Sequence, residues 1–218
     1  MDHWCVLIVH TYGWYRARMP LPRFTRLPGE EQQRILKAAR AVFAADGVDH
    51  ATYADVIQGA GISKSSAYNY FDGRDDLLGI VLDEVASRLR SALGTWEHVA
   101  DHEAFWDALD EADSRLLLHE TEHPDDLALI DPAFLLRMQG GFIGWVSAVI
   151  DNGIEINLIT VDCERDLIVS ATAALLRVGD AWLAEKMNAG LVPDYEQRWT
   201  LLRGLWGVPS SKGPPRLR

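Results

Sequence analysis

The sequence predicts an all-α protein with two unlike parts. Apolar residues recur at helical spacing through most of the 218 residues, and no stretch alternates long enough to predict a strand. Glycines and prolines stand where these helical patterns would end. A short polar and aromatic helix that starts near residue 64 contrasts with the apolar helices that follow it. We therefore expect a small three-helix amino-terminal domain and a larger helical body.

The chain begins with an expected flexible basic arm, residues 1–29, which contains several arginines and prolines at positions 20, 22 and 28. Met19 offers an alternative start, in which case residues 1–18 would be an upstream artefact. The first domain is expected over residues 30–75. Its first helix has an apolar face from Ile35 to Phe43 and ends at Asp46-Gly47, because glycine readily adopts the left-handed conformation that closes a helix.

Two short helices follow in the stretch TYADVIQGAGISKSSAYNYF. Thr52 is a good N-cap for the first, with Asp55 in the position that completes a capping box. Gly61 supplies the turn, and Ser63 caps the second helix, expected over residues 64–70. Pairs of this kind form helix-turn-helix motifs, in which the second helix enters the major groove of DNA.

The outer side of the second helix has the chemistry for such a contact. Serine and tyrosine hydroxyls can donate to phosphate oxygens, lysine adds positive charge, and asparagine can bridge the edge of adenine. Thr52 can also present its hydroxyl and the free amides of its helix to a phosphate. The expected DNA-binding residues are Thr52, Ser63, Lys64, Ser65, Ser66, Tyr68, Asn69, Tyr70 and Arg74.

The run from Ile35 to Leu78 resembles the amino-terminal domain of the tetracycline-repressor (TetR) family of bacterial regulators. The likeness lies in ILKAARAVFAADGVDHAT, YADVIQGAGISKSSAYNYF and DGRDDLL. It implies phosphate contacts from Tyr68 and Tyr70, with Lys64, Ser65, Ser66 and Asn69 near the bases. Arg74 stands where the family usually has lysine, and two positions depart from the pattern: Ala67 replaces a larger aliphatic residue and Ile57 replaces alanine.

The charge distribution favours an oriented DNA contact. The net charge is −11, but residues up to Arg74 carry nine basic and seven acidic side chains, so the rest of the chain carries −13. Phosphates would attract the first part and repel the second. A generic acidic surface is the alternative explanation of this charge.

The body, residues 76–207, is expected to bind a small molecule and to dimerise, as the resemblance implies. Its helices are expected near residues 74–93, 103–119, 125–130, 132–151, 162–189 and 194–206. Aromatic residues recur on successive helices, where they either pack the core or line a ligand pocket, and three glycines at 140, 141 and 144 would leave space nearby. The candidate pocket residues are Trp96, Phe105, Trp106, Phe134, Met138, Phe142 and Trp145.

The last two helices form the candidate dimer interface, because a short linker lets them lie side by side as half of a four-helix bundle. The alternative is that both apolar stripes cover the subunit's own core. The expected interface residues are Leu167, Ala171, Ala174, Leu175, Val178, Trp182, Tyr195, Trp199, Leu202 and Trp206. A two-fold dimer would recognise palindromic double-stranded DNA.

A rival interpretation is a metal-dependent hydrolase, since residues 119–123 match H-E-x-x-H. That chemistry needs His119 and His123 on one helical face, with Glu120 as general base. Pro124 disfavours the helical conformation for His123, and no third ligand follows at a suitable spacing. We therefore expect no catalytic residue and no metal.

Other features narrow the function class. Cys5 and Cys163 form no CxxC pair, and neither a phosphate loop nor a nucleophile elbow occurs, so no cofactor is expected. The apolar run Cys5–Val9 is too short to span a membrane or to act as a signal peptide, which favours a cytoplasmic protein. Residues 208–218 are expected to be a disordered tail. The combined expectation is a homodimeric DNA-binding repressor released from its operator by an unidentified small-molecule effector.

Overall fold

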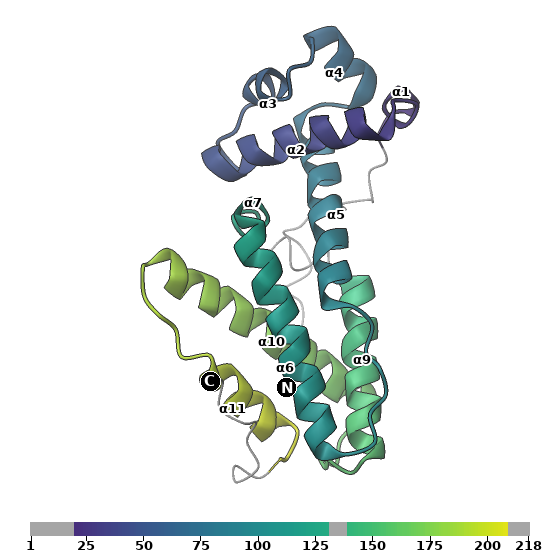
Figure 1. The fold of residues 1–218 in the computed structure, drawn as a ribbon, viewed down its shortest axis with the longest axis vertical. Coiled ribbons are helices and arrows are strands. Elements are labelled where there is room, and N and C mark those ends of the chain that lie inside the picture. Colours follow the sequence, from purple (N-terminus) through teal and green to yellow (C-terminus); the bar gives the residue numbers. More distant parts are fainter. Residues whose placement is uncertain (1–19, 131–138, 209–218) are drawn as a thin grey trace, which may run out of the picture. The chain divides into compact units, whose positions relative to one another are not determined.

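The computed structural model describes residues 20–130 and 139–208, and this part of the chain consists of helices and connecting segments without a strand (Figure 1). The expected all-α class is confirmed. The helices are α1 Pro22–Thr25, α2 Gly29–Asp46, α3 Tyr53–Gly59, α4 Lys64–Tyr70, α5 Arg74–Leu93, α6 His102–Glu122, α7 Pro124–Leu127, α9 Gln139–Glu155, α10 Arg165–Asn188 and α11 Glu196–Leu205.

The chain divides into two compact units between Glu84 and Val85, which is inside α5. The sequence suggested a boundary nine residues earlier, between residues 75 and 76. The difference arises because the first half of α5 contributes buried side chains, Leu77 and Val81 among them, to the amino-terminal unit. One continuous helix therefore belongs to both units.

Residues 20–27 are more ordered than the expected flexible arm. Pro22 starts α1 at a position where its missing N–H costs no hydrogen bond. Phe24 is buried with its ring centroid 4.8 Å from that of Phe71, and the Leu21 amide donates to the Tyr70 carbonyl at 2.9 Å. The arm expectation is wrong for these residues because an aromatic contact and a backbone bond attach them to the end of α4. Residues 1–19 of the expected arm lie outside the described part.

The three helices expected in the amino-terminal domain are confirmed as α2, α3 and α4. The apolar face of α2 is buried, and α2 packs against α3. Gly59 makes this approach possible, because a Cβ atom there would lie 2.5 Å from Cγ2 of Val42. A larger residue at 59 would push the two helices apart.

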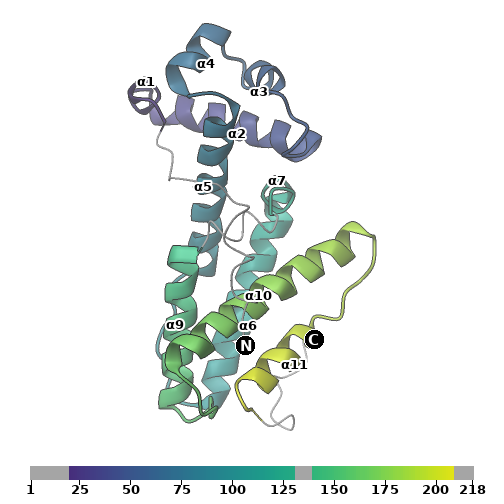
Figure 2. The same ribbon diagram turned by 180° about the vertical axis from the view of Figure 1, so that it is seen from behind.

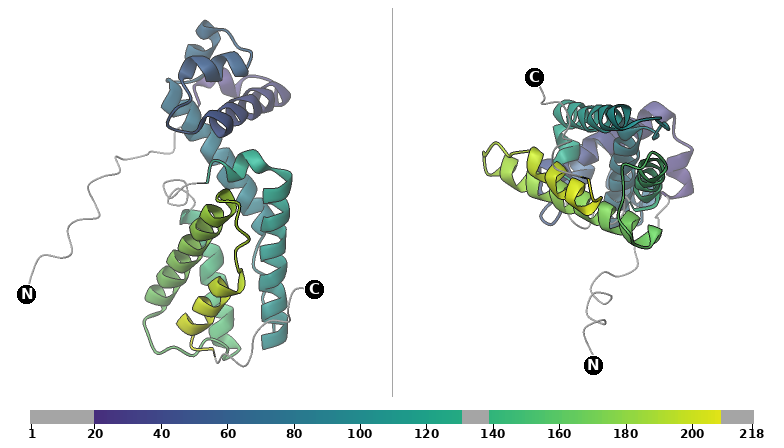
Figure 3. Two further views of the ribbon diagram at one scale, coloured as in Figure 1. Left: turned by 90° about the vertical axis from the view of Figure 1, so that its left-hand side faces the viewer. Right: turned by 90° about the horizontal axis from the view of Figure 1, so that it is seen from below.

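In the carboxy-terminal unit α10 packs against both α9 and α11 (Figures 2 and 3). Between the helices lies an apolar core to which α6, α9, α10, α11 and the chain between α9 and α10 contribute. Its buried members are Phe105, Trp106, Leu109, Val146, Val149, Ile150, Leu158, Ile159, Ile168, Val169, Ala173, Leu202, Trp206 and Val208.

Two boundaries in this unit differ from expectation. Asn152-Gly153 was expected to end a helix, but α9 continues to Glu155. The Asn152 side chain is buried and bonds the segment between α5 and α6. It accepts from the Val99 amide and donates to the Val99 carbonyl. Val208, expected as the first residue of the tail, is buried, and its amide donates to the Arg203 carbonyl at 2.9 Å. Residues 209–218 lie outside the described part.

Candidate nucleic-acid interface and ligand cavity

Hydrogen-bonded caps fix the start of both short helices. The Thr52 hydroxyl accepts from the Asp55 amide at 3.2 Å, and the Asp55 carboxylate accepts from the Thr52 amide at 3.1 Å. Hydrogen bonds from Thr52 also hold the pKa of Asp55 below its ordinary value. The Ser63 hydroxyl accepts from the Ser66 amide at 3.0 Å. Gly61, with φ of +63°, forms the turn in a conformation that strains other residues.

The inner faces of α3 and α4 are apolar and closed to solvent. Val56 and Ala60 are fully buried, and so is Ala67, the one buried residue of α4. Ile57 is nearly so. The two departures from the family pattern, Ile57 and Ala67, therefore both occupy buried positions. Residues of α4 other than Ala67 remain available for contact with a partner.

The outer face of α4 brings together the side chains that the sequence predicted. Lys64, Ser65 and Asn69 are exposed, and Tyr68 is 55% exposed. Ser66 and Tyr70 are half-buried. The hydroxyls of Ser63 and Ser66 lie 2.9 Å apart, so these two serines bond each other as well as the helix start. The Ser65 hydroxyl also lies 2.9 Å from that of Ser63. The exposed polar surface of α4 therefore consists mainly of Lys64, Ser65, Tyr68 and Asn69.

Aromatic neighbours hold the two tyrosines of α4. Tyr53 meets Tyr68 edge to face with ring centroids 5.5 Å apart, and Phe24 meets Tyr70 at 6.0 Å. Burial, with smaller contributions from Tyr68 and two nearby aspartates, raises the pKa of Tyr53 to about 12. These contacts restrict the rotation of Tyr68 and Tyr70, so that their hydroxyls are presented with little loss of entropy on binding.

Arg23 of α1 is part of this surface, although the sequence singled out no residue of the arm. Its Nη1 donates to Oδ1 of Asn69 at 2.9 Å, and both side chains are exposed. A guanidinium group is thus added to the edge of α4. The only signal in the sequence was the arginine content of the region, because the contact joins residues 46 positions apart.

Arg74 has a structural role in place of the expected phosphate contact. Its Nε donates to the Ala51 carbonyl at 2.6 Å, and its Nη2 donates to the Val48 carbonyl. The guanidinium also lies 5.5 Å from the centre of the Phe43 ring and pairs with Asp75 at 3.0 Å. Arg74 thus holds the connection between α2 and α3, a role that the sequence did not predict.

In the carboxy-terminal unit most of the expected pocket aromatics are core residues. Phe105 and Trp106 are buried, and Trp96 packs on Phe105 with ring centroids 5.1 Å apart. The Trp96 indole also donates to Asn152 at 3.0 Å. Core packing therefore accounts for Trp96, Phe105 and Trp106. Phe134 and Met138 lie outside the described residues.

Phe142 and Trp145 do line hollow space. A cavity of about 120 Å³ lies among α5, α6, α7, α9, α10 and α11, and a second of about 50 Å³ shares several of its residues. Phe142 lines both cavities and Trp145 the smaller one. The walls are mainly leucines, but five charged residues also line the larger cavity: Asp113, Glu120, Arg177, Asp180 and Arg198. The sequence analysis missed these charges because they come from three separate helices.

Arg198 is the centre of this charged group. Its side chain is buried, and it donates to Asp180 at 2.6 Å and to Asp113 on the opposite helix. Its guanidinium lies 5.1 Å from the Trp199 ring. Gly179 permits the approach, since a Cβ there would lie 2.9 Å from Arg198 Cδ. The two carboxylates raise the pKa of Arg198 against the opposing effect of burial.

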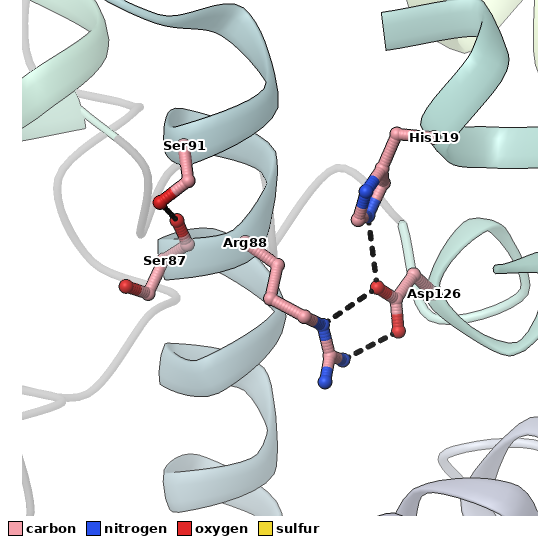
Figure 4. A network of polar contacts seen from close by, with 5 residues as sticks. All are labelled: Ser87, Arg88, Ser91, His119 and Asp126. Carbon is pink, nitrogen blue, oxygen red and sulfur yellow. Dashed lines mark hydrogen bonds and ion pairs between the residues drawn. The ribbon is translucent and has the colours of Figure 1, made fainter. Parts of the chain in front are cut away.

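A second buried network links α5, α6 and α7, with Asp126 at its centre (Figure 4). Asp126 is fully buried and accepts from Arg88 Nε at 3.0 Å and Arg88 Nη2 at 2.6 Å. Its second partner is His119, whose Nε2 lies 3.1 Å from Oδ2. Leu127, the next residue, lines the larger cavity. A carboxylate on α7 thus joins the cavity wall to α5.

The same geometry removes the basis for the hydrolase interpretation. His119 bonds Asp126, while His123 ends α6 with a non-helical backbone (φ −130°, ψ 64°), as Pro124 predicted. Glu120 lines the cavity. Within residues 20–130 and 139–208 no three His, Cys, Asp or Glu side chains are grouped so that they could hold a metal ion. The three residues therefore serve other contacts.

The side chains expected at the dimer surface are mostly exposed or half-buried on α10, whereas those on α11 mostly face the subunit's own core. On α10 Leu167 and Val178 are exposed, and Ala171, Ala174 and Trp182 are half-buried. Leu175, also half-buried, packs against the core. On α11 Leu202 and Trp206 are buried, Trp199 packs on the core, and Tyr195 lines the cavity. This stripe faces inward because it closes the subunit's own core, while Leu201 is exposed beside it.

Residues 35–80 match the model of the family described as bacterial regulatory proteins, tetR family. This segment of the chain is therefore similar to the amino-terminal domain of tetR-family regulators. A relative, the HTH-type transcriptional regulator LuxR of Vibrio harveyi, is 32% identical over 72 residues, which is 33% of this chain. The match spans 35% of that relative's length. Both matches are to transcriptional regulators.

Solved structures of similar fold cover most of the chain. A TetR-like transcriptional regulator from Rhodococcus sp. RHA1 aligns with 84% of the chain and 97% of its own length, with a TM-score of 0.56 and 20% identity. The fatty acid degradation regulator FadR from Bacillus halodurans aligns with 80% of the chain and 97% of its own, with a TM-score of 0.56 and 14% identity. At these identities the likeness concerns the fold.

Proposed function

We propose that this protein is a homodimeric, ligand-responsive transcriptional repressor that acts on DNA in the cytoplasm. The observation that carries the proposal is the capped α3–α4 pair, which presents Lys64, Tyr68 and Asn69 on one exposed face within a tetR-family domain. Each subunit would insert α4 into a major groove, with hydroxyl and cationic groups on phosphates and Asn69 at the base edges.

The decisive experiment selects binding sites from random duplexes with the purified full chain and measures affinity for the selected sequence at several salt concentrations. We expect a palindrome with half-sites about one helical turn apart, or a small multiple of it. The affinity should fall steeply with salt because phosphate contacts release counterions. A protein that enriches no sequence and binds no duplex at low salt would contradict the proposal.

Two substitutions on α4 should have different effects. Tyr68→Phe removes a phosphate donor and should weaken binding to specific and unrelated duplexes alike, by roughly threefold to tenfold. Asn69→Ala should weaken specific binding by about 1 to 3 kcal/mol and relax base preference at one position of the half-site. Repeating the site selection with each variant measures both effects.

Tyr195→Phe is the matched control, because it removes a tyrosine hydroxyl in the other unit, where the hydroxyl contacts Met187. It should leave both affinity and base preference unchanged. If Tyr68→Phe and Asn69→Ala altered every sequence by the same factor, the separate roles given to the two residues would be lost.

The dimer surface is supported by the unsatisfied apolar face of α10. Only 29% of the most apolar 18-residue stretch of α10 is buried inside the subunit, and the Val178 side chain is 70% exposed. By length and composition alone α10 also resembles a membrane-spanning helix. Its packing against α9 and α11 and the adjacent exposed Leu201 instead favour burial against a second copy, as in a four-helix bundle.

Val178→Asp should therefore separate the subunits. A two-fold interface would bury both new carboxylates, and the expected effect is a weakening of the dimer of about 100-fold. Sedimentation velocity over a range of concentrations measures it. Leu118→Asp is the control, because Leu118 is similarly exposed but lies on α6. Dissociation caused equally by both changes, or by neither, would contradict the α10 interface.

The larger cavity is the proposed effector site. Leu89 and Leu93 of α5 line it together with residues of the other helices, and Asp126 ties α7 to Arg88 of the same helix. A ligand in the cavity thus touches the helix that begins at Arg74 in the DNA-binding unit. Release from DNA would require only a few kcal/mol of differential ligand affinity between two conformations.

A further inference from the structure

The charges that line the larger cavity do not balance. Three carboxylates, Asp113, Glu120 and Asp180, face two guanidinium groups, Arg177 and Arg198. Arg198 bonds both aspartates, so they share a single positive charge. Glu120 receives no hydrogen bond and no ion pair from the residues that the structure describes, although Arg198 attracts it weakly from a distance. Among the described residues, one carboxylate on the cavity wall is therefore left without a direct partner.

Two further polar atoms at the cavities lack partners. Nε of Arg198 and Nε1 of Trp145 are both buried, and neither has an acceptor in the described part of the chain. Both residues line the smaller cavity, and Arg198 lines the larger one as well. Both atoms are N–H donors, so a molecule that completes the site carries an acceptor oxygen near them in addition to any charged group.

The remaining walls are apolar. Helices α5, α7 and α9 line the larger cavity with uncharged side chains: Leu89, Leu93, Leu127 and Phe142. Tyr195 adds a second aromatic ring. A ligand that fits must accordingly combine a hydrophobic body with a charged group, and it can carry an acceptor oxygen for the two unsatisfied donors. An anionic group would meet three carboxylates and enlarge the charge imbalance, whereas a cation would cancel it.

We propose that the larger cavity binds a small organic cation, an amine or quaternary ammonium on a short hydrophobic body, with the positive charge against the carboxylate of Glu120. This assignment rests on the proposed effector role of the cavity and adds the chemical class of the ligand. The hydrophobic body would lie against the leucines and the aromatic rings. The faces of the aromatic rings would also attract the positive charge.

The pH dependence of this site follows from the groups around Glu120. Burial, helped by Asp180 and Asp113 and opposed by Arg198, raises the pKa of Glu120 to about 7. The other titratable groups on the cavity wall are Arg177 and Tyr195, while the described lining residues of α5, α7 and α9 are uncharged. Below pH 7 the empty site is mostly protonated at Glu120, so a cation must displace a proton to bind.

The test uses the full-length protein and three matched probes in calorimetric titrations: 4-phenylbutyltrimethylammonium, 5-phenylvalerate and 4-phenylbutanol. The ammonium compound should bind at least tenfold more tightly than the other two at pH 8. Its affinity should fall by up to tenfold per pH unit below pH 7 and level off above that pH. Because the ammonium group does not titrate, this change reports on the protein.

Glu120→Gln should reduce ammonium affinity at least tenfold at pH 8 and abolish the pH dependence, with affinity for the alcohol unchanged. Glu122→Gln, an equal charge change at an exposed position of the same helix, should leave both intact. Tighter binding of the carboxylate, no binding of the ammonium compound, or full retention by Glu120→Gln would each overturn the assignment. Operator binding measured on the same samples tests the regulatory role separately, since it requires no ligand and should survive in Glu120→Gln.

Discussion

Replacing Asp126 by alanine is expected to lower the free energy of unfolding of the carboxy-terminal unit by about 3 to 5 kcal/mol. The Asp126 carboxylate is fully buried and accepts two bonds from Arg88 and one contact from His119 (Figure 4). Its removal leaves the Arg88 guanidinium, which is only partly exposed, without its anion, and leaves a cavity beside it. Both effects destabilise the same three-helix junction.

Urea unfolding followed by tryptophan fluorescence measures this loss, because the tryptophans of the described chain lie in the second unit. Asp125→Ala is the control: it removes a neighbouring carboxylate of α7 that is not fully buried, and the unfolding midpoint should move little. Equal stability of the two variants would show that the Asp126 network does not hold α7 against α5 and α6.

The same substitution bears on the proposed response to ligand. If Asp126 transmits the state of the cavity to α5, folded Asp126→Asn protein should bind its operator but respond less to an effector than the parent does. Asparagine keeps the shape and one acceptor oxygen, so more protein should remain folded than with alanine. A full response in folded Asp126→Asn would assign transmission to Leu89 and Leu93 alone.

Arg74→Ala is expected to destabilise the amino-terminal unit by roughly 2 to 4 kcal/mol, since the carbonyls of Val48 and Ala51 lose a charged donor. The contact of the guanidinium with Phe43 is lost as well. Circular dichroism during thermal unfolding measures the effect without DNA. This result would distinguish a structural arginine from one that merely adds charge to the surface.

The salt dependence of DNA binding gives the complementary measurement. Arg74→Ala should leave the slope of log affinity against log salt unchanged, because its donors are occupied within the protein. Lys64→Ala should lower that slope by about one and leave stability unchanged, since Lys64 is exposed on α4. The reverse pattern, a lower slope with unchanged stability for Arg74→Ala, would restore Arg74 to the phosphate contacts.

The amino-terminal unit could be predicted almost to the residue because its signals are local. In both caps the hydroxyl accepts a hydrogen bond from the backbone amide three positions later, from Asp55 to Thr52 and from Ser66 to Ser63. Gly47 and Gly61 adopt the positive φ values that their turns require. The exposed face of α4 followed from the same helical spacing. The structural role of Arg74 could not be predicted because its partners, Val48 and Ala51, lie more than twenty positions away.

In the body, spacing predicted most helices but could not assign the apolar stripes to their partners. A stripe that closes the subunit's own core and one that meets a second chain have the same period, so Leu202 and Trp206 were placed on the wrong side. The cavity was equally hidden. Its charged lining joins Asp113 and Arg198 across 85 positions, and no local pattern in either helix predicts the pair.

The sequence by itself determined the helical class, the position of α4 and the side chains that α4 exposes. It did so because caps, glycine turns and helical periodicity act over a few residues. Tertiary structure alone decided which charges meet in the cavity, which face of α11 is buried, and that Arg74 and Asp126 hold other elements in place. Those outcomes depend on distant segments that compete for the same buried space and the same hydrogen-bond donors, and that competition is settled only when the helices pack.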